Sequence, residues 1–223
     1  MSVCMESFSF TELARSDHPP LDHLSLAVAA ELRPDTDAVS ALDALDALGE
    51  EVAGELADRE RTPAAEAAAL TEVLGVRHAF HGVGEDYDDP DRSMLDLVLE
   101  RRIGLPILLS VLYVEVARRA GAQLAGVGLA GHFVVGHFGA DPPLLIDPFH
   151  RGRRLPAALA PSLVHAWGPH ETARRMLTNL VSSYIARHDL GRAIRAAELR
   201  LVVAGSDREA LELELRGLRA RLN

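Results

Sequence analysis

Hydrophobic and polar positions divide the 223-residue chain into three regions of different periodicity. In the first region, residues 1–88, apolar side chains recur every three or four positions, which predicts an amphipathic helix. These side chains are Val39, Leu42, Leu45, Leu48, Val52 and Leu56. A second helix is expected to begin with Thr62 as its cap and Pro63 in its first turn, and to end near Gly75.

The middle region, residues 89–168, opens with a short predicted helix. Ser93 and Asp96 have the spacing of a capping box at its start. Residues 105–119 are apolar nearly all the way round, so a helix here must be buried on every side. Pro106 fits the first turn of this helix, where its missing N–H costs nothing.

Beyond Gly121 the pattern changes to short segments rich in Val, Leu and Gly, namely "LAGVGLA", "HFVVGHF" and "LLIDPF". Gly131 and the stretch "GADPP" separate them as turn signals, which predicts a small antiparallel sheet. A buried helix packed on a small sheet, with helical regions on either side, makes the expected fold class α+β.

The third region, residues 169–223, predicts three helices with breaks at "HDLG" and "AGSD". Ser206 and Glu209 have the spacing of a capping box for the last helix. Ala193 and Ala197 are small residues suited to the seam of a helix pair, as in a tetratricopeptide unit. We expect this tail to pack on the middle region, because a single repeat is marginal alone.

Composition narrows the possible functions. The chain is 48% hydrophobic and 25% charged, and its net charge of −10 argues against nucleic-acid and anionic-membrane partners. All 23 basic residues are arginines, which excludes Schiff-base and pyridoxal-phosphate chemistry. The single cysteine, Cys4, excludes an internal disulfide and a multi-cysteine zinc site. The sequence shows no secretion signal or membrane span, so a cytoplasmic protein is expected.

The predicted strands carry the most informative polar residues. His132 begins one strand and Asp147 ends the next, so neighbouring strands can place an imidazole beside a carboxylate that orients it. His137, five positions after His132, is expected on the opposite face of the sheet. Both a catalytic pair and a purely structural buried pair fit this spacing.

Several longer stretches resemble a known family. "YDDPDRSMLDLVLERRIGLPILLSVLYVEVARRAG", "GVGLAGHFVV" and "LLIDPFHRGR" resemble the transglutaminase-like core of the SirB-type family. "RRMLTNLVSSYIARHDLGRAIR" is similar to the tetratricopeptide-like end of that family. The resemblance runs from about residue 11 to residue 205 and implies a papain-like α+β core with helical additions at both ends.

Active enzymes of the transglutaminase-like class begin the central helix with Gly-x-Cys, followed by a strand His and a strand Asp. The resemblance assigns these last two roles to His132 and Asp147. It assigns the glycine to Gly104 and sets Pro106 at the place of the cysteine. Because a proline offers no nucleophile and Cys4 lies outside the motif, thiol transglutaminase or protease chemistry is not expected.

Ser110 lies one helical turn after Pro106 and is a weaker candidate nucleophile. Alternatively, its hydroxyl donates to the carbonyl of Pro106, as serines in apolar helices commonly do. His150 follows Asp147 closely and could join it and His132 around a zinc ion, although no metal and no cofactor is the favoured expectation.

Five residues are candidate binding residues beside the histidine. They are Pro106, Tyr87, Asp89, Arg102 and Asn179. Structural roles are the favoured explanation for four of them. Tyr87 and Asp89 suit a turn. Arg102 suits a surface ion pair, and Asn179 suits a hydrogen bond between tail and core.

Three functional hypotheses remain open. The first is a module without a nucleophile that binds a peptide or protein segment, with His132 and Asp147 as polar contacts. The second is a hydrolase or acyltransferase acting on an amide or ester, with Ser110 or a water molecule as the nucleophile. The third is a scaffold in which the histidine–carboxylate pair only stabilises the fold.

Overall fold

The computed structural model describes residues 9–85, 87–156 and 164–221. Its α-helices are α1 (Phe10–Arg15), α2 (Leu21–Leu32), α3 (Ala38–Leu56), α4 (Pro63–Leu70), α5 (Leu95–Arg101), α6 (Pro106–Arg119), α7 (Pro169–Ala186), α8 (Leu190–Val202) and α9 (Arg208–Ala220). Its strands are β1 (Leu124–Leu129), β2 (His132–His137), β3 (Leu144–Asp147) and β4 (Arg153–Arg154). Shorter helical segments are the π-helix η1 (Thr71–Arg77) and the 3₁₀ helices η2 (Pro90–Ser93) and η3 (Pro148–His150).

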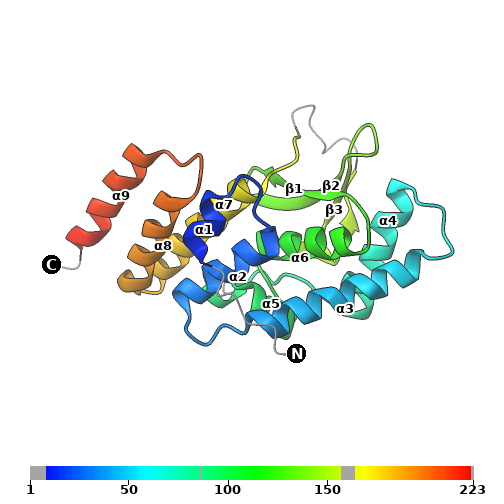
Figure 1. The fold of residues 1–223 in the computed structure, drawn as a ribbon, viewed down its shortest axis with the longest axis horizontal. Coiled ribbons are helices and arrows are strands. Elements are labelled where there is room, and N and C mark those ends of the chain that lie inside the picture. The colour runs from blue at the N-terminus through cyan, green and yellow to red at the C-terminus, as the bar shows by residue number, and fades with distance from the viewer. Residues whose placement is uncertain (1–8, 86, 157–163, 222–223) are drawn as a thin grey trace.

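The molecule is elongated, with α6 near its centre and the helices α7, α8 and α9 toward one end (Figure 1). Two large hydrophobic clusters follow this division. The first cluster joins α6 to α3, α4 and the inner face of the sheet. The second joins α1 and α2 to the three C-terminal helices. The helices of the first sequence region are therefore shared between the two clusters.

Helix α6 confirms the expectation of a helix buried on all sides. Its residues from Pro106 to Tyr113 are all buried, as are Glu115, Val116 and Ala117. Pro106 is the first helical residue, where no intrahelical bond requires its N–H. Gly49 of α3 allows close approach, because a β-carbon there would lie 2.5 Å from Cβ of Arg119. The chain ahead of α6 is equally tight, since a β-carbon on Gly104 would lie 2.9 Å from a methyl group of Val98.

The sheet has the order β1-β2-β3-β4, with every neighbouring pair antiparallel. The three predicted strands are confirmed, and the two-residue strand β4 was not predicted. Turns at Gly131, which has a φ of 72°, and in the segment before β3 separate the strands. Strand alternation sends Phe133 and Val135 into the core with α6, and sends Val134 to a small cluster with Val127 and Leu145.

Most predicted helix boundaries are confirmed, but two predicted capping boxes are wrong. Helix α5 begins after Met94, and the buried hydroxyl of Ser93 has no hydrogen-bond partner among the described residues. Asp96 instead pairs with Arg33 at 3.0 Å. Asp207 rather than Ser206 caps α9, because the Asp207 carboxylate accepts from the backbone N–H of the third helical residue. A carboxylate is as good a cap as a hydroxyl, which the serine-based prediction overlooked.

Two further details qualify the helical predictions. Thr62 caps α4 as expected, with Pro63 as its first residue. The helix then continues as a π-helix past Gly75, whose missing β-carbon leaves room for the carbonyl of Arg151. Val39 is 46% exposed although it belongs to the predicted apolar face of α3.

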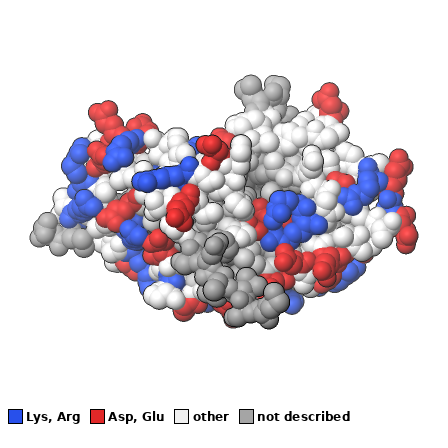
Figure 2. Space-filling view, in the orientation of Figure 1, with Lys and Arg blue, Asp and Glu red and all other residues white. Residues whose placement is uncertain are grey.

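The tail forms the three predicted helices, with Ala193 and Ala197 buried at their seam. Helix α7 also packs on α2 and α6, which agrees with the expected docking of the tail on the middle region. None of the helices in the described ranges is long and apolar enough to cross a membrane. On the face shown in Figure 2, acidic and basic side chains are interspersed.

A buried ion-pair network joins α2 to the end of α6. Asp22, fully buried, accepts hydrogen bonds from Arg119 at 2.7 Å and from Arg118 at 3.3 Å. Arg119 also donates to the buried carboxylate of Glu115 at 3.1 Å. Burial together with the negative charge of Asp22 raises the pKa of Glu115. The arginines compensate two buried carboxylates, so each charge depends on its partners.

Replacing Asp22 with Asn is expected to reduce the acid sensitivity of the fold. Burial raises the pKa of Asp22, but hydrogen bonds from His23 and Arg119 outweigh it and lower the pKa from 3.8 to about 2. This carboxylate stabilises the native state fully above about pH 4, and that stabilisation, about 2 kcal/mol, is lost as the pH falls through 2. Urea unfolding between pH 2 and 6 measures the difference.

The control for this prediction is Asp46→Asn. Asp46 pairs with the same Arg119, but its side chain is 66% exposed, so the pair contributes little. The Asp46→Asn protein should keep the acid dependence of the unmodified chain. Equal acid dependence in Asp22→Asn and the unmodified chain would contradict the assignment.

Candidate functional site

The register of the sheet places His132 and Asp147 on one face. Val135 lies opposite Ile146, so continuing the register sets Asp147 opposite Val134, two residues from His132. Diagonal neighbours of this kind are within reach of long side chains. The Nε2 atom of His132 lies 3.0 Å from Oδ2 of Asp147. The side-by-side placement expected from the sequence is present.

His150 joins this pair from the 3₁₀ helix η3. Asp147 caps η3, and in a 3₁₀ helix the side chains three residues apart eclipse each other. The Nδ1 atom of His150 therefore lies 2.7 Å from the same Oδ2 of Asp147. Oδ1 of Asp147 accepts from the backbone N–H of Phe149 at 3.1 Å. One carboxylate thus holds two imidazoles and the start of a helix.

The electrostatics of the cluster favour an ionised Asp147. Burial raises the pKa of this carboxyl, but hydrogen bonds from His132 and His150, together with their charge, hold the pKa below its ordinary value. The nearby Tyr113 is fully buried, and its hydroxyl has no hydrogen-bond partner in the described part of the chain. Burial, with the added charge of Asp147, raises the pKa of Tyr113, so this phenol stays neutral.

The ring of Phe149 positions the cluster. It packs edge-on against His132 with centroids 5.9 Å apart, and against His150 at 5.3 Å. On the segment before α5, Tyr87 lies 6.5 Å from the same ring. Gly82 makes room for Phe149, because a β-carbon on Gly82 would lie 1.8 Å from the phenyl ring. Phe149 therefore connects the histidines to Tyr87.

Tyr87 and Asn179 meet in a surface hollow of about 380 Å³ at the start of α6. Its lining comes from the segment before α5, from the start of α6 and from one face of α7, and comprises Tyr87, Asp88, Leu105, Asn179, Ser182, Ser183 and Ala186. Asp88 is paired at 3.1 Å with Arg187, the residue that follows α7, which fixes one wall of the hollow. Two of the candidate binding residues are thus brought together.

Three other candidates lie elsewhere or are buried. Pro106 is buried and shapes the start of α6 rather than presenting a surface. Asp89 caps η2 by accepting from the N–H of Asp91, as a turn residue would. Arg102 is exposed, ends α5 in a left-handed conformation with a φ of 61°, and forms no ion pair with any described residue. Their roles in binding stay predictions.

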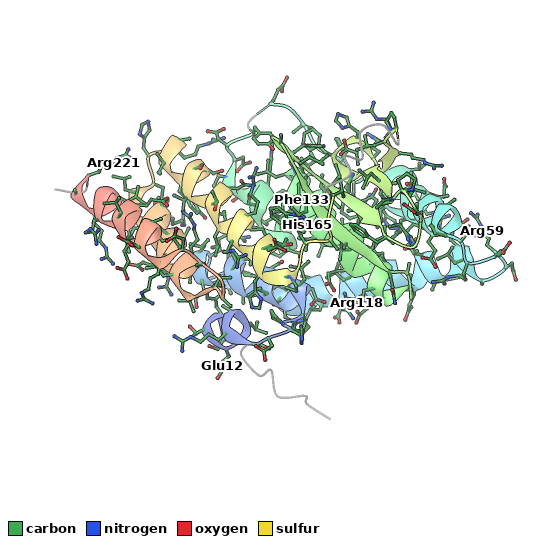
Figure 3. The ribbon with its side chains drawn as sticks, turned by 90° about the horizontal axis from the view of Figure 1, so that it is seen from above. Glu12, Arg59, Arg118, Phe133, His165 and Arg221 are labelled. Carbon is green, nitrogen blue, oxygen red and sulfur yellow. The ribbon has the colours of Figure 1, made fainter. Side chains whose placement is uncertain are left out.

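The structure does not join Ser110 to His132. Ser110 is 1% exposed, and its hydroxyl lies 3.5 Å from the carbonyl oxygen of Phe133. This carbonyl replaces the expected acceptor, the carbonyl of Pro106. Figure 3 shows Phe133 near the middle of the molecule, where its buried ring packs edge-on against Trp167 at 5.2 Å. Cys4 lies outside the described residues.

His137 occupies a different site, as the spacing predicted. It is buried, and its Nε2 lies 2.8 Å from Oε2 of Glu66 on α4. Phe149 and Gly82 are the positioning residues that sequence reasoning missed. The only local signals for them are an aromatic residue directly after "DP" and a glycine in the loop-like stretch "HGVGEDYDDPDRS", and neither is specific.

The comparisons with known proteins agree with this architecture. A family model described as the transglutaminase-like superfamily matches residues 39–188, which include α6, the sheet and the histidine cluster. The chain belongs to the transglutaminase-like superfamily. It is 34% identical to a "UPF0162 protein" of Xylella fastidiosa (strain 9a5c), over 86% of this chain and 74% of that protein. The "UPF0162 protein" of strain Temecula1 / ATCC 700964 matches with the same figures. No solved structure matches the chain.

Within this superfamily member, Gly82→Ala is expected to disturb the cluster through Phe149. The added methyl group must displace the ring, which costs about 1–3 kcal/mol of unfolding free energy. The NMR signals of the His132 and His150 rings should shift as well. Gly84→Ala is the matched control, because a β-carbon there meets nothing within 4 Å. Equal unfolding free energies for the two variants would show that Phe149 is not held by Gly82.

Proposed function

We propose that this chain is a peptide-binding member of the transglutaminase-like superfamily, in its SirB-type branch, without thiol chemistry. The observation that carries the proposal is the hollow of about 380 Å³ at the start of α6. Tyr87 of its lining packs against Phe149, whose ring also packs against His132. The proposal includes a cytoplasmic location and a protein partner.

The start of α6 supports binding rather than covalent catalysis. Its first residue is Pro106, which carries no nucleophilic group, and Leu105 provides no side-chain cap. The side chain that the resemblance would pair with His132 is thus absent from this position. The chain has one cysteine, Cys4, which is remote in sequence from the motif.

The chemistry of the hollow suits an extended peptide. The exposed Tyr87 provides apolar contact, while the Asn179 amide can donate to a peptide carbonyl and accept from a peptide N–H. Ser182 adds a hydroxyl on the same wall. The C-terminal helices, which we interpret as a tetratricopeptide-like unit, offer a second surface for the same partner.

A second function is favoured by one observation. His132 keeps its carboxylate partner Asp147, the arrangement in which a histidine activates water for attack on an amide or ester. This hydrolase alternative needs no protein nucleophile. It differs from the first proposal in requiring turnover that depends on His132.

Selection of a phage-displayed library of random peptides on the full chain tests the binding proposal. Tyr87→Ala and Asn179→Ala should each weaken the selected peptides by about 10-fold, because each removes a contact in the hollow. His132→Ala should weaken binding, and no peptide hydrolysis is expected in either the variant or the unmodified chain. Fluorescence anisotropy gives the affinities, and mass spectrometry of the peptides detects cleavage.

The control variant is Val39→Ala, which shortens a 46% exposed apolar side chain on α3, outside both the hollow and the C-terminal helices. It should bind the selected peptides as the unmodified chain does. Unchanged peptide affinity in both Tyr87→Ala and Asn179→Ala would overturn the placement of the site. Peptide cleavage that disappears in His132→Ala would overturn the binding proposal in favour of the hydrolase.

A fluorophosphonate probe tests Ser110 as a nucleophile. Ser110 is buried and lies against the carbonyl of Phe133, so no adduct is expected on this residue. Intact-mass spectrometry of the treated protein, followed by peptide mapping, provides the measurement. A covalent adduct on Ser110 that is absent from Ser110→Ala would establish serine chemistry instead.

A further inference from the structure

Three potential metal ligands converge where β2, β3 and η3 meet. Among residues 9–85, 87–156 and 164–221, His132, Asp147 and His150 offer ligand atoms that all lie within 4.8 Å of one another. Two of them come from neighbouring strands, and the third is brought in by one turn of 3₁₀ helix. This convergence is a product of the fold, since His132 and His150 are far apart along the chain.

The distances suit a small tetrahedral ion. Zinc bonds of about 2.0–2.1 Å at tetrahedral angles separate neighbouring ligand atoms by about 3.3 Å. Oδ2 of Asp147 lies 3.0 Å from Nε2 of His132 and 2.7 Å from Nδ1 of His150. Both distances to Oδ2 are close to this separation, and the ligand atoms of the two histidines lie within 4.8 Å of each other.

The ligands are held in place from behind. The N–H of Phe149 fixes Oδ1 of Asp147, which leaves Oδ2 as the atom that faces both imidazoles. The backbone then turns back at Arg151 and Gly152, and the Gly152 N–H donates to the carbonyl of Asp147 at 2.8 Å. Outer contacts of this type orient metal ligands in proteins.

The cluster is also open on one side and carries the right charge. The side chain of Asp147 is 3% exposed, that of His132 is 27% exposed, and that of His150 is 51% exposed. An ion bound from the histidine side would keep one position for water. Arg153, the cross-strand neighbour of Asp147, is exposed and forms no ion pair with any described residue, so it does not neutralise the carboxylate.

We propose that His132, Asp147 and His150 bind a divalent transition-metal cation of the zinc type, with water as a further ligand. Two imidazoles and one carboxylate favour such ions over Mg²⁺ and Ca²⁺, which prefer all-oxygen sites. Zinc acidifies the water that it binds. The site would thus provide a hydroxide as a nucleophile in a fold whose central helix begins with Pro106, which offers none. The inference does not depend on peptide binding in the hollow.

Metal binding can be measured directly on the full chain without an affinity tag, in a Cys4→Ser background that removes the thiol. After treatment with a chelator and dialysis, isothermal titration should show one Zn²⁺ per chain with a dissociation constant of about 1 μM or tighter. Co²⁺ in place of Zn²⁺ should give visible absorption bands of a low-coordinate site. Mg²⁺ and Ca²⁺ should not compete.

His132→Ala and His150→Ala should each weaken Zn²⁺ binding by at least about 10-fold, the smallest loss usual even for outer contacts of metal sites. His165→Ala is the matched control. His165 is also a histidine beside a carboxylate, 3.5 Å from Glu171, but its side chain is 65% exposed and it belongs to no group of three potential ligands within the described ranges. Figure 3 labels its position. This variant should bind Zn²⁺ as the unmodified chain does.

Circular dichroism confirms that each variant is folded. His150 is half exposed, so His150→Ala decides the question even if His132→Ala destabilises the protein. Absence of Zn²⁺ binding by the unmodified chain would overturn the proposal. So would Zn²⁺ affinity that is unchanged in His150→Ala, or equally tight binding of Mg²⁺.

Discussion

The burial of α6 on all sides is the constraint on which the rest of the structure depends. A helix without a polar face is stable only if other elements cover it completely, and here α3, α4 and the sheet do so. Close packing leaves no freedom at its start, where Gly104 touches Val98 and Pro106 is buried. The sheet that covers α6 also carries His132 and Asp147. The position of the candidate site is therefore a consequence of how this helix is buried.

A second organising feature is the carboxylate of Asp147. It is nearly inaccessible, yet it pairs with two imidazoles and caps η3, so its removal from water is compensated by three hydrogen bonds. The imidazoles are more exposed than the carboxylate, so the polar groups of the cluster face outward. The ring of Phe149 lies between the cluster and the hollow, since it packs against both His132 and Tyr87. The hollow and the charged cluster are thus neighbouring features with different linings.

The local sequence pattern predicted an element correctly where its formation depends mainly on hydrophobic burial or on a turn residue. The apolar run of α6, the alternating strands and the breaks before α8 and α9 were all predicted, since burial and turn conformations are local requirements. Predictions failed where two similar groups compete for one role. Asp207 took the cap expected of Ser206, and Asp96 paired with Arg33 instead of capping α5. The first choice is between adjacent residues of similar capping ability, and the second depends on a partner distant in the sequence.

The sequence by itself determined most helices and strands of this protein and the superfamily resemblance. It also determined the proximity of His132 to Asp147, because a hairpin register follows from local turns. Only the tertiary structure decided that His150 turns onto the same carboxylate oxygen, that Tyr87 meets Asn179, and that Asp22 anchors the end of α6. His150 lies only three residues after Asp147 and reaches it through η3, whereas the other two contacts join segments far apart in the chain. Their geometry is set by the packing of whole helices against the sheet, and no local periodicity encodes it.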